Sequence, residues 1–363
     1  MKALEIIPFN LKFMLVIIAF FALISGSCKK TNEGGVVAPT TAIDTTLYKA
    51  MPFPMGVALN VNLLRNNTKY NAVATKEYNS VTAENVMKFA GLHPGQNTYN
   101  WTDADYLVDF AISNGKRVHG HTLIWHNSQP AWVTNFVGDS LAWENLLKTH
   151  IQTVMTHFKG KVGSWDVVNE AFDDNGVLRT SIWRQKLGPD YVARCFKYAF
   201  EADPSALLFY NDYGQENNQA KRNAITAMMS SFKNRGIPIH GIGLQFHISY
   251  TQSDANMTSV INAAIGSGLK IHISELDVKV NSGKSQTFVF TPALAEQQAA
   301  KYKSVMKIYN TIPQNQQFGI TIWNIGDGDS WIPNFQGAPD FPLPFDLNFK
   351  RKPAYKGIID GVK

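Results

Sequence analysis

The sequence predicts an α/β protein folded as a single (β/α)8 TIM barrel, and three observations support this. Eight short apolar or β-branched runs recur along residues 45–363. Segments with helical spacing separate the runs, an order that produces parallel strands joined by helices. Polar residues gather where the runs end, at the edge on which barrel enzymes carry their sites. The predicted strands are residues 55–60, 78–85, 117–125, 162–170, 206–212, 240–247, 270–277 and 318–324.

An open, doubly wound parallel sheet is the alternative arrangement of the same elements. The dinucleotide-binding form of that fold carries a glycine-rich phosphate loop after its first strand. The chain contains neither GxGxxG nor GxxxxGK[ST], so the sequence favours the closed barrel.

The segment LAWENLLKTHIQTVMTHFKG at 141–160 illustrates the helical spacing between two predicted strands. Apolar residues at intervals of three and four place one face of this helix in the core. That face comprises Leu147, Ile151, Val154, Met155 and Phe158. A second apolar-rich helical stretch, YVARCFKYAF at 191–200, contains Cys195, which we expect to be a buried, inert thiol.

The composition excludes several classes of protein. The chain has 363 residues, of which 45% are hydrophobic, with 26 glycines and 16 prolines. These values are ordinary for a globular protein, so collagen, coiled coil and disordered chains are excluded. Lys and Arg number 34 against 28 Asp and Glu, which gives a net charge of +6. The basic residues form no long run, and this disfavours nucleic-acid binding.

The N-terminal residues predict an export signal. Lys2 and Lys12 precede an uncharged apolar run at 13–24, which is shorter than the about 20 residues of a membrane-spanning helix. Small residues follow and lead to Cys28, as in the acylation site of bacterial lipoproteins, although Ser25 departs from that pattern. A plain secretory signal peptide is the alternative.

We therefore expect a lipoprotein signal at 1–27, a polar Gly/Pro/Thr-rich tether at 28–44 and a catalytic body at 45–363. The expected location is the outer membrane or cell surface, with lipidation at Cys28. Without lipidation, the periplasm or the extracellular space is expected.

Polar residues occupy the ends of seven of the eight predicted strands. In a closed barrel, all carboxyl ends of the strands meet around one mouth. The pattern therefore predicts a ring of polar side chains around one pocket. The ring consists of Glu84 with Asn85, Trp125 with His126, Asn169 with Glu170, Asn211 with Asp212, Gln245 with His247, Glu275 with Asp277, and Trp323 with Asn324.

Glu170 and Glu275 form a candidate catalytic pair. They end the fourth and seventh predicted strands, and closure of the barrel would place them across one pocket. Glycoside hydrolysis needs one protonated carboxyl group to release the leaving alcohol and one ionised group to attack or stabilise the reacting sugar. Their surroundings must then separate the two pKa values. We expect His247 and Asp277 to form a hydrogen-bonded chain that holds Glu275 ionised.

Long motifs around these residues resemble glycoside hydrolase family 10, the endo-β-1,4-xylanases. SWDVVNEAF at 164–172 and HISELDV at 272–278 resemble the two active-site segments of that family. The resemblance covers about residues 50–360 in order, and it includes SVTAENVMKF at 80–89, RVHGHTLIWHNSQPAW at 117–132, LFYNDYG at 208–214, GIGLQFHIS at 241–249, TIWNIGDGDSW at 321–331 and RKPAY at 351–355.

The resemblance implies a (β/α)8 barrel that hydrolyses xylan with retention of anomeric configuration and without a cofactor. It implies xylan and xylo-oligosaccharides as partners, and we expect a monomer. Glu170 would be the general acid/base, Glu275 the nucleophile, and Asn169 a ligand of the sugar 2-hydroxyl. The remaining implied residues are His247 and Asp277 behind Glu275, Gln245 beside His247, Glu84, Asn85 and Lys88 on the non-reducing side, His121, Trp125 and Gln129 around the reacting sugar, Trp323 and Trp331 against sugar faces, and Tyr213 on the leaving-group side.

Three positions depart from the family pattern. Asn324 follows Trp323 where Gly is common, Phe246 stands where a small residue is usual, and Phe89 replaces a Trp. The first two affect expectations about sugar subsites, and the third affects packing. None of them alters the two glutamates.

Functions of other kinds remain open at this point. His119 and His121 form an HxH pair on one strand face, as in metal-dependent amidohydrolases. That reading expects the pair on the first strand and further ligands on later strands, whereas this pair lies on the third. A barrel that only binds glycan would be expected to lack one of the glutamates. A cellulase or β-glucosidase would keep the mechanism and change the sugar.

Overall fold

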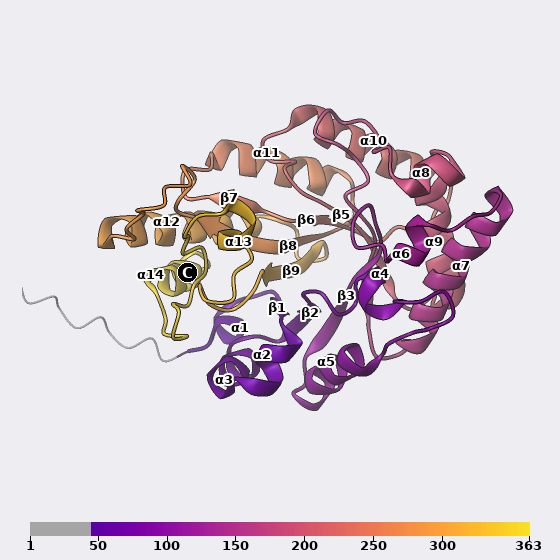
Figure 1. The fold of residues 1–363 in the computed structure, drawn as a ribbon. Coiled ribbons are helices and arrows are strands. Elements are labelled where there is room, and N and C mark those ends of the chain that lie inside the picture. The colour runs from indigo at the N-terminus through magenta and orange to yellow at the C-terminus, as the bar shows by residue number, and fades with distance from the viewer. Residues whose placement is uncertain (1–44) are drawn as a thin grey trace, which may run out of the picture. The chain divides into compact units, whose positions relative to one another are not determined.

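Eight parallel strands close into a barrel in the computed structural model, which describes residues 45–363 (Figure 1). A ninth, short strand, β7, pairs only with the end of β8. The strands within the described residues are β1 (Met55–Leu59), β2 (Ser80–Ala83), β3 (Arg117–Trp125), β4 (Ser164–Asn169), β5 (Leu207–Asp212), β6 (Gly241–Leu244), β7 (His247–Ser249), β8 (Lys270–Lys279) and β9 (Gln317–Ile322).

The order of hydrogen-bonded strands explains the closure. Strands β1 to β6 pair with their neighbours in sequence, and β1 also pairs with β9. Gly241 of β6 lies opposite Lys270 of β8, and this pairing joins the two ends of the sheet. All the pairings between named strands are parallel, so all carboxyl ends of the strands face one mouth. The structure therefore confirms the predicted (β/α)8 barrel.

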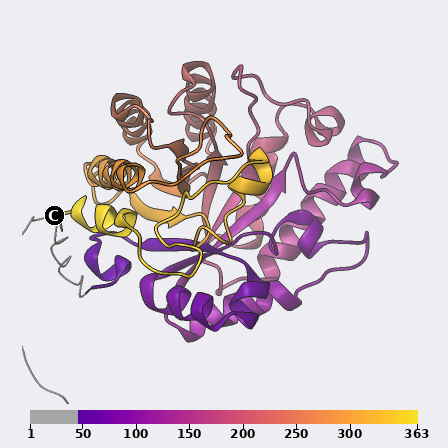
Figure 2. The same cartoon turned by 60° about the vertical axis from the view of Figure 1, so that its left-hand side comes forward.

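Helices surround the strands on the outside of the barrel (Figures 1 and 2). The principal helix after each barrel strand is α3 (Thr68–Glu77), α5 (Thr102–Ser113), α7 (Ser140–His157), α9 (Tyr191–Ala202), α10 (Gln219–Asn234), α11 (Asp254–Gly266), α12 (Pro292–Tyr309) or α14 (Pro353–Asp360). Short helices lie before β1 and in the connections: α1 (Leu47–Ala50), α2 (Val61–Asn66), α4 (Phe89–Leu92), α6 (Ala131–Thr134), α8 (Ile182–Leu187) and α13 (Ile332–Gln336).

The helices form where the sequence supplies both a cap and an apolar face. Asp139 caps α7 by accepting a hydrogen bond from the backbone of Ala142, and Thr291 caps α12 in the same way. The predicted core face of α7 is confirmed, because all five of its apolar residues are buried. Cys195 of α9 is also buried as predicted, and burial raises the pKa of its thiol.

The sixth predicted strand is divided in two. The sequence predicts one strand at 240–247, whereas the structure has β6, a break, and then β7. Phe246 lies at the break with φ of 59°, which an extended strand does not accommodate. β7 therefore starts afresh at His247 and runs beside the end of β8.

Glycines on two strands make room for large side chains of the neighbouring strands. An ideal Cβ at Gly120 of β3 would lie 2.2 Å from the ring of Trp165 on β4. An ideal Cβ at Gly241 of β6 would lie 2.0 Å from the ring of Phe209 on β5. These two positions can therefore carry no side chain while the aromatic residues keep their places.

The predicted signal at 1–27, the lipidation site Cys28 and the tether at 28–44 lie outside the described residues. Among residues 45–363, none of the helices combines the length and the apolar character that crossing a bilayer requires.

Candidate active site

The two glutamates reach the same mouth of the barrel from strands that are not neighbours. Glu170 directly follows β4, and Glu275 lies within the carboxyl-terminal half of β8. The side chains are largely buried, with exposed fractions of 12% for Glu170 and 7% for Glu275. Strands β5 and β6 separate β4 from β8 in the barrel, so side chains from these strands lie between the two carboxylates.

Three amide side chains connect the two carboxylates. Asn211 at the end of β5 donates from Nδ2 to Glu275 Oε1 at 2.7 Å and to Asn169 Oδ1 at 3.0 Å. Gln245, just after β6, donates from Nε2 to Asn169 Oδ1 at 3.3 Å and to Glu170 Oε1 at 2.9 Å. We call Asn169, Asn211 and Gln245 the amide bridge. It fixes the position of one glutamate relative to the other.

A glycine on β6 makes the amide bridge sterically possible. Asn211 lies opposite Gly243 in the register of β5 and β6. An ideal Cβ at Gly243 would lie 2.1 Å from Asn211 Oδ1. The hydroxyl of Ser274 donates to the same oxygen at 2.6 Å, so the amide of Asn211 is oriented from both sides.

Glu170 is surrounded by neutral hydrogen-bond donors. Trp125 Nε1 donates to Glu170 Oε2 at 2.9 Å, while Gln245 and Asn169 donate to Oε1. Glu170 also has a left-handed backbone with φ of 56°, which is uncommon for a residue other than glycine. This conformation turns the chain at the end of β4.

Glu275 is held by a cation. His247 Nε2 lies 3.2 Å from Glu275 Oε2, and His247 Nδ1 lies 2.7 Å from Asp277 Oδ2. Although burial alone would lower it, the carboxylates of Asp277 and Glu275 raise the pKa of His247 to about 10. Both ring nitrogens then carry protons and donate to the two carboxylates.

This contact also determines the ionisation of Glu275. Burial would raise the pKa of Glu275, but the hydrogen bond from His247 and the nearby charge of His121 lower it. The hydrogen-bonded chain that the sequence predicts is present in the structure. Glu275 is therefore ionised in the free protein over the neutral pH range.

Two tryptophans lie beside this chain. Trp331 donates from Nε1 to Asp277 Oδ2 at 3.0 Å, and its ring centroid lies 4.8 Å from that of His247. Trp323 follows β9, with its ring 5.4 Å from that of His121. The structure therefore places both tryptophans on the side of the mouth that holds Glu275.

The HxH pair contacts a carboxylate. His121 Nδ1 lies 2.9 Å from Asp166 Oδ2, and His119 Nε2 lies 3.1 Å from Asp166 Oδ1. Although burial favours its protonated form, Asp166 has a lowered pKa because of these two histidines. Within residues 45–363, no three or more His, Cys, Asp and Glu side chains form a group that could hold a metal ion.

Polar residues after β2 and β3 form another part of the mouth. Lys88 donates from Nζ to Asn85 Oδ1 at 3.0 Å and lies 5.2 Å from the centre of a Trp125 ring. Burial lowers the pKa of Lys88, while Glu275, Glu84 and Glu170 raise it, so Lys88 is within electrostatic reach of both candidate catalytic groups. Glu84 Oε2 accepts a hydrogen bond from the side chain of Asn60.

Gln129 follows β3 and contacts the backbone of the last residue of that strand. Its Nε2 donates to the backbone carbonyl of Trp125. Trp183 Nε1 donates to the same carbonyl at 3.1 Å. Both contacts hold the backbone of Trp125 in place.

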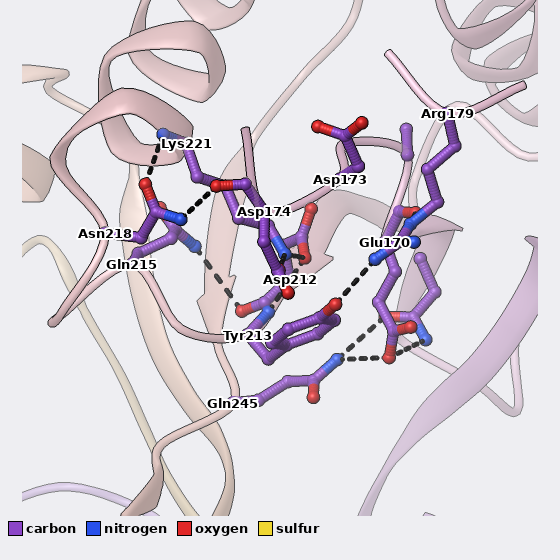
Figure 3. Close-up of polar contacts among 12 residues, drawn as sticks. Glu170, Asp173, Asp174, Arg179, Asp212, Tyr213, Gln215, Asn218, Lys221 and Gln245 are labelled. Atoms are coloured by element: carbon purple, nitrogen blue, oxygen red, sulfur yellow. Dashed lines mark hydrogen bonds and ion pairs between the residues drawn. The ribbon is translucent and has the colours of Figure 1, made fainter. Parts of the chain in front are cut away.

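Tyr213 lies after β5, on the Glu170 side of the mouth (Figure 3). Lys221 from α10 lies over its ring, with Nζ 3.4 Å from the centroid, and pairs with Asp212 at 2.8 Å. Burial raises the pKa of Asp212 to about 6, although Lys221 opposes this effect. The hydroxyl of Tyr213 accepts a hydrogen bond from Arg179.

Asn324 and Phe246, the two strand-end residues that depart from the family pattern, share one backbone feature. Asn324 has φ of 81° and Phe246 has φ of 59°, and both side chains are buried. A left-handed backbone is least strained with glycine, which explains why a small residue suits these positions. Neither amide atom of Asn324 has a hydrogen-bond partner among residues 45–363.

Sequence reasoning did not assign roles to three residues of this site. Asn211 was recognised only as a polar strand end, although it joins Glu275 to Asn169. Asp166 pairs with the HxH histidines, and the alternation of side chains along β4 was the signal for its inward direction. Arg179 lies in a loop without strand periodicity, so no pattern pointed to it.

The arrangement suits chemistry that uses two carboxyl groups in different roles. One carboxylate is kept ionised by an imidazolium, and the other accepts hydrogen bonds from an indole and two amides. Such a pair can supply a nucleophile and a proton donor to opposite sides of one bond. Indole and phenol rings beside polar side chains suit ligands with apolar C–H faces and hydroxyl edges.

Comparisons with known proteins agree with this chemistry. The sequence profile described as Glycosyl hydrolase family 10 matches residues 44–361. Exoglucanase XynX from Acetivibrio thermocellus is 38% identical over 86% of the chain, which spans 29% of that protein. Endo-1,4-beta-xylanase B from Paenibacillus barcinonensis is 36% identical over 85% of the chain, which spans 96% of that protein. The chain thus covers under a third of some relatives and nearly all of others.

A solved structure extends the likeness to three dimensions. The crystal structure of xylanase 10B from Thermotoga petrophila RKU-1 in complex with xylobiose has a TM-score of 0.82 with this chain. The two chains are 36% identical, and the match covers 87% of this chain and 95% of that one.

The ionisation of His247 gives a testable prediction. Asp277→Asn removes one of the two carboxylates that raise the pKa of His247, so this pKa falls below about 10. Wild-type His247 contributes stability that is fully present below its unfolded pKa of about 6.5 and is lost as the pH rises towards about 10. An NMR titration of the imidazole carbon-bound protons measures the shift. An unchanged titration in Asp277→Asn would contradict the assignment.

Asp254→Asn is the matched control for this titration. Asp254 is exposed on α11 and pairs with Lys301 of α12, and within residues 45–363 no hydrogen bond or ion pair joins it to His247. The control is expected to leave the titration of His247 unchanged.

Proposed function

The chain belongs to glycosyl hydrolase family 10, and we propose that it is an endo-1,4-β-xylanase that cleaves xylan within the chain. The observation that carries the proposal is the pair of Glu170 and Glu275, which the amide bridge holds across one mouth. The names of the relatives support xylose as the sugar. Breakdown of plant polysaccharide is the process that this activity would serve.

We propose a retaining, double-displacement reaction at this pair. Ionised Glu275 attacks the anomeric carbon while Glu170 gives its proton to the leaving oxygen, and the glycosidic bond breaks. A covalent glycosyl ester on Glu275 results. Glu170, now a carboxylate, removes a proton from water, which attacks the ester carbon and frees Glu275.

The residues around the pair have proposed binding roles. Asn169 lies beside Glu170 and would donate to the sugar 2-hydroxyl, a contact that strengthens in the transition state. His247 and Asp277 act as positioning residues for Glu275. The other proposed contacts are Glu84, Asn85 and Lys88 on the non-reducing side, His121, Trp125, Gln129, Gln245, Trp323 and Trp331 around the reacting sugar, and Tyr213 on the leaving-group side.

A glucan is the second candidate substrate, because one relative is named an exoglucanase. Glucose carries a hydroxymethyl group that xylose lacks, so the shape of the mouth decides between them. Residues 45–363 should release reducing ends from glucuronoxylan and release none from carboxymethylcellulose. Release from cellulose alone would keep the two-glutamate mechanism and reject the xylanase assignment. Release from neither would favour a glycan-binding protein.

The two glutamates should respond differently to substitution. Glu275→Gln removes the nucleophile and should abolish turnover of both xylan and 2,4-dinitrophenyl β-xylobioside. Glu170→Gln should lower turnover of xylan by about 10²–10⁴-fold. With the aryl glycoside, whose leaving group needs no proton, it should give a burst of dinitrophenolate followed by slow hydrolysis.

Circular dichroism of both variants serves as the control for folding. Substantial residual activity in folded Glu275→Gln would reject Glu275 as the nucleophile. A Glu170→Gln variant without a burst, or with wild-type activity on xylan, would reject Glu170 as the acid/base.

Membrane anchoring is proposed separately, from the small residues before Cys28. Acylation of Cys28 would attach the enzyme to a membrane through residues 28–44, with the body as a monomer. Full-length protein expressed in a bacterium that processes lipoproteins should partition with membranes, and Cys28→Ser should release it into the soluble fraction. Complete membrane partition of Cys28→Ser would reject the anchor.

A further inference from the structure

Arg179 joins the backbone of Glu170 to the hydroxyl of Tyr213 (Figure 3). Its Nε donates to the carbonyl oxygen of Glu170 at 3.0 Å, and its Nη2 donates to Tyr213 Oη at 2.6 Å. The guanidinium is planar and rigid, so the two contacts set a fixed spacing between these groups. The backbone N–H of Arg179 also donates to the carbonyl of Ala171 at 2.7 Å.

The backbone of Glu170 needs support of this kind. Its left-handed φ of 56° is a conformation that persists only where neighbouring groups hold it. The N–H of Glu170 donates to the carbonyl of Asn211 at 2.8 Å, and the N–H of Ala171 donates to Tyr210 Oη at 3.0 Å. Arg179 supplies a contact on the carbonyl of Glu170.

Tyr213 is fixed at several points as well. Its N–H donates to Asp212 Oδ1 at 2.9 Å, and Lys221 Nζ covers one face of its ring at 3.4 Å from the centroid. A sugar can therefore stack only on the other face. Asp212 and Lys221 are fully buried and hold the base of the ring, while Arg179 holds its tip.

We propose that Arg179 is a positioning residue that holds the proton donor Glu170 and the sugar platform Tyr213 at a fixed distance and orientation relative to each other. A sugar stacked on Tyr213 then presents its glycosidic oxygen to the carboxyl group of Glu170. This inference rests on the proposed function, because it assigns Glu170 to proton donation and Tyr213 to the leaving-group side. Arg179 acts through these two residues and does not touch the reacting atoms.

The inference predicts a selective loss. A leaving sugar needs both the platform and the proton, whereas 2,4-dinitrophenolate needs neither. Misplacement of about 1 Å can cost about 10²-fold in rate. Arg179→Gln should therefore lower kcat/KM for xylotetraose by about 10²-fold, and lower kcat/KM for 2,4-dinitrophenyl β-xylobioside by less than about 3-fold.

Arg184→Gln is the matched control. Arg184 belongs to the same connection, where its Nη1 donates to the carbonyl of Leu178. Among residues 45–363, no hydrogen bond or ion pair joins it to Glu170 or Tyr213. If Arg179 only stabilised this loop, the two variants would behave alike. The inference requires Arg184→Gln to retain the wild-type ratio of the two kcat/KM values.

A double-mutant cycle tests the link itself. Tyr213→Phe removes the acceptor of the Arg179 contact and keeps the aromatic ring. Because one link is broken by either change, the double variant should lose no more kcat/KM for xylotetraose than Arg179→Gln alone. A double variant whose loss of kcat/KM equals the product of the two single-variant losses would overturn the inference.

Arg179→Lys separates position from charge. Lysine keeps the charge but cannot span both acceptors with a rigid fork, so the selective loss should persist. Full recovery in Arg179→Lys would overturn the inference in favour of a purely electrostatic effect. Equal losses on both substrates, or none on either, would overturn it too. A wild-type protein inactive on both substrates would instead reject the proposed function.

Discussion

The hydrogen bonds of the amide bridge are the interaction on which the site depends. Glu170 and Glu275 belong to β4 and β8, which are separated by β5 and β6, so no strand pairing sets their relative position directly. The two intervening strands supply the connecting side chains, Asn211 and Gln245. Because the NH2 group of an amide has two N–H donors, it can link two acceptors that would otherwise repel each other.

The bridge holds two chemically identical groups, and their surroundings make them different. Glu275 faces an imidazolium that a second carboxylate, Asp277, keeps protonated. Glu170 faces an indole and two amides, which carry no net charge. The hydrogen-bond donors around the two carboxylates therefore differ in charge.

The barrel and its site were predictable to different extents. Strand runs and the core face of α7 follow from periodicity, because burial of one face requires it. The polar strand ends were visible for the same reason, including Asn211. The break at Phe246 was not, since its left-handed backbone is unusual for an aromatic residue. The contacts of Arg179 were hidden as well, because they join a loop to residues that only the closed barrel brings near.

Three glycines mark positions on the barrel strands that cannot diversify. Gly243 leaves the space that Asn211 occupies, and Gly120 and Gly241 do the same for aromatic rings. A random library that varies these glycines would consist mostly of variants that misfold or in which the amide bridge is broken. The loop after β9 carries the ring of Trp331, a residue that none of the strand pairings includes. Changes of sugar preference are therefore accessible to evolution through the loops, while the strands stay constant.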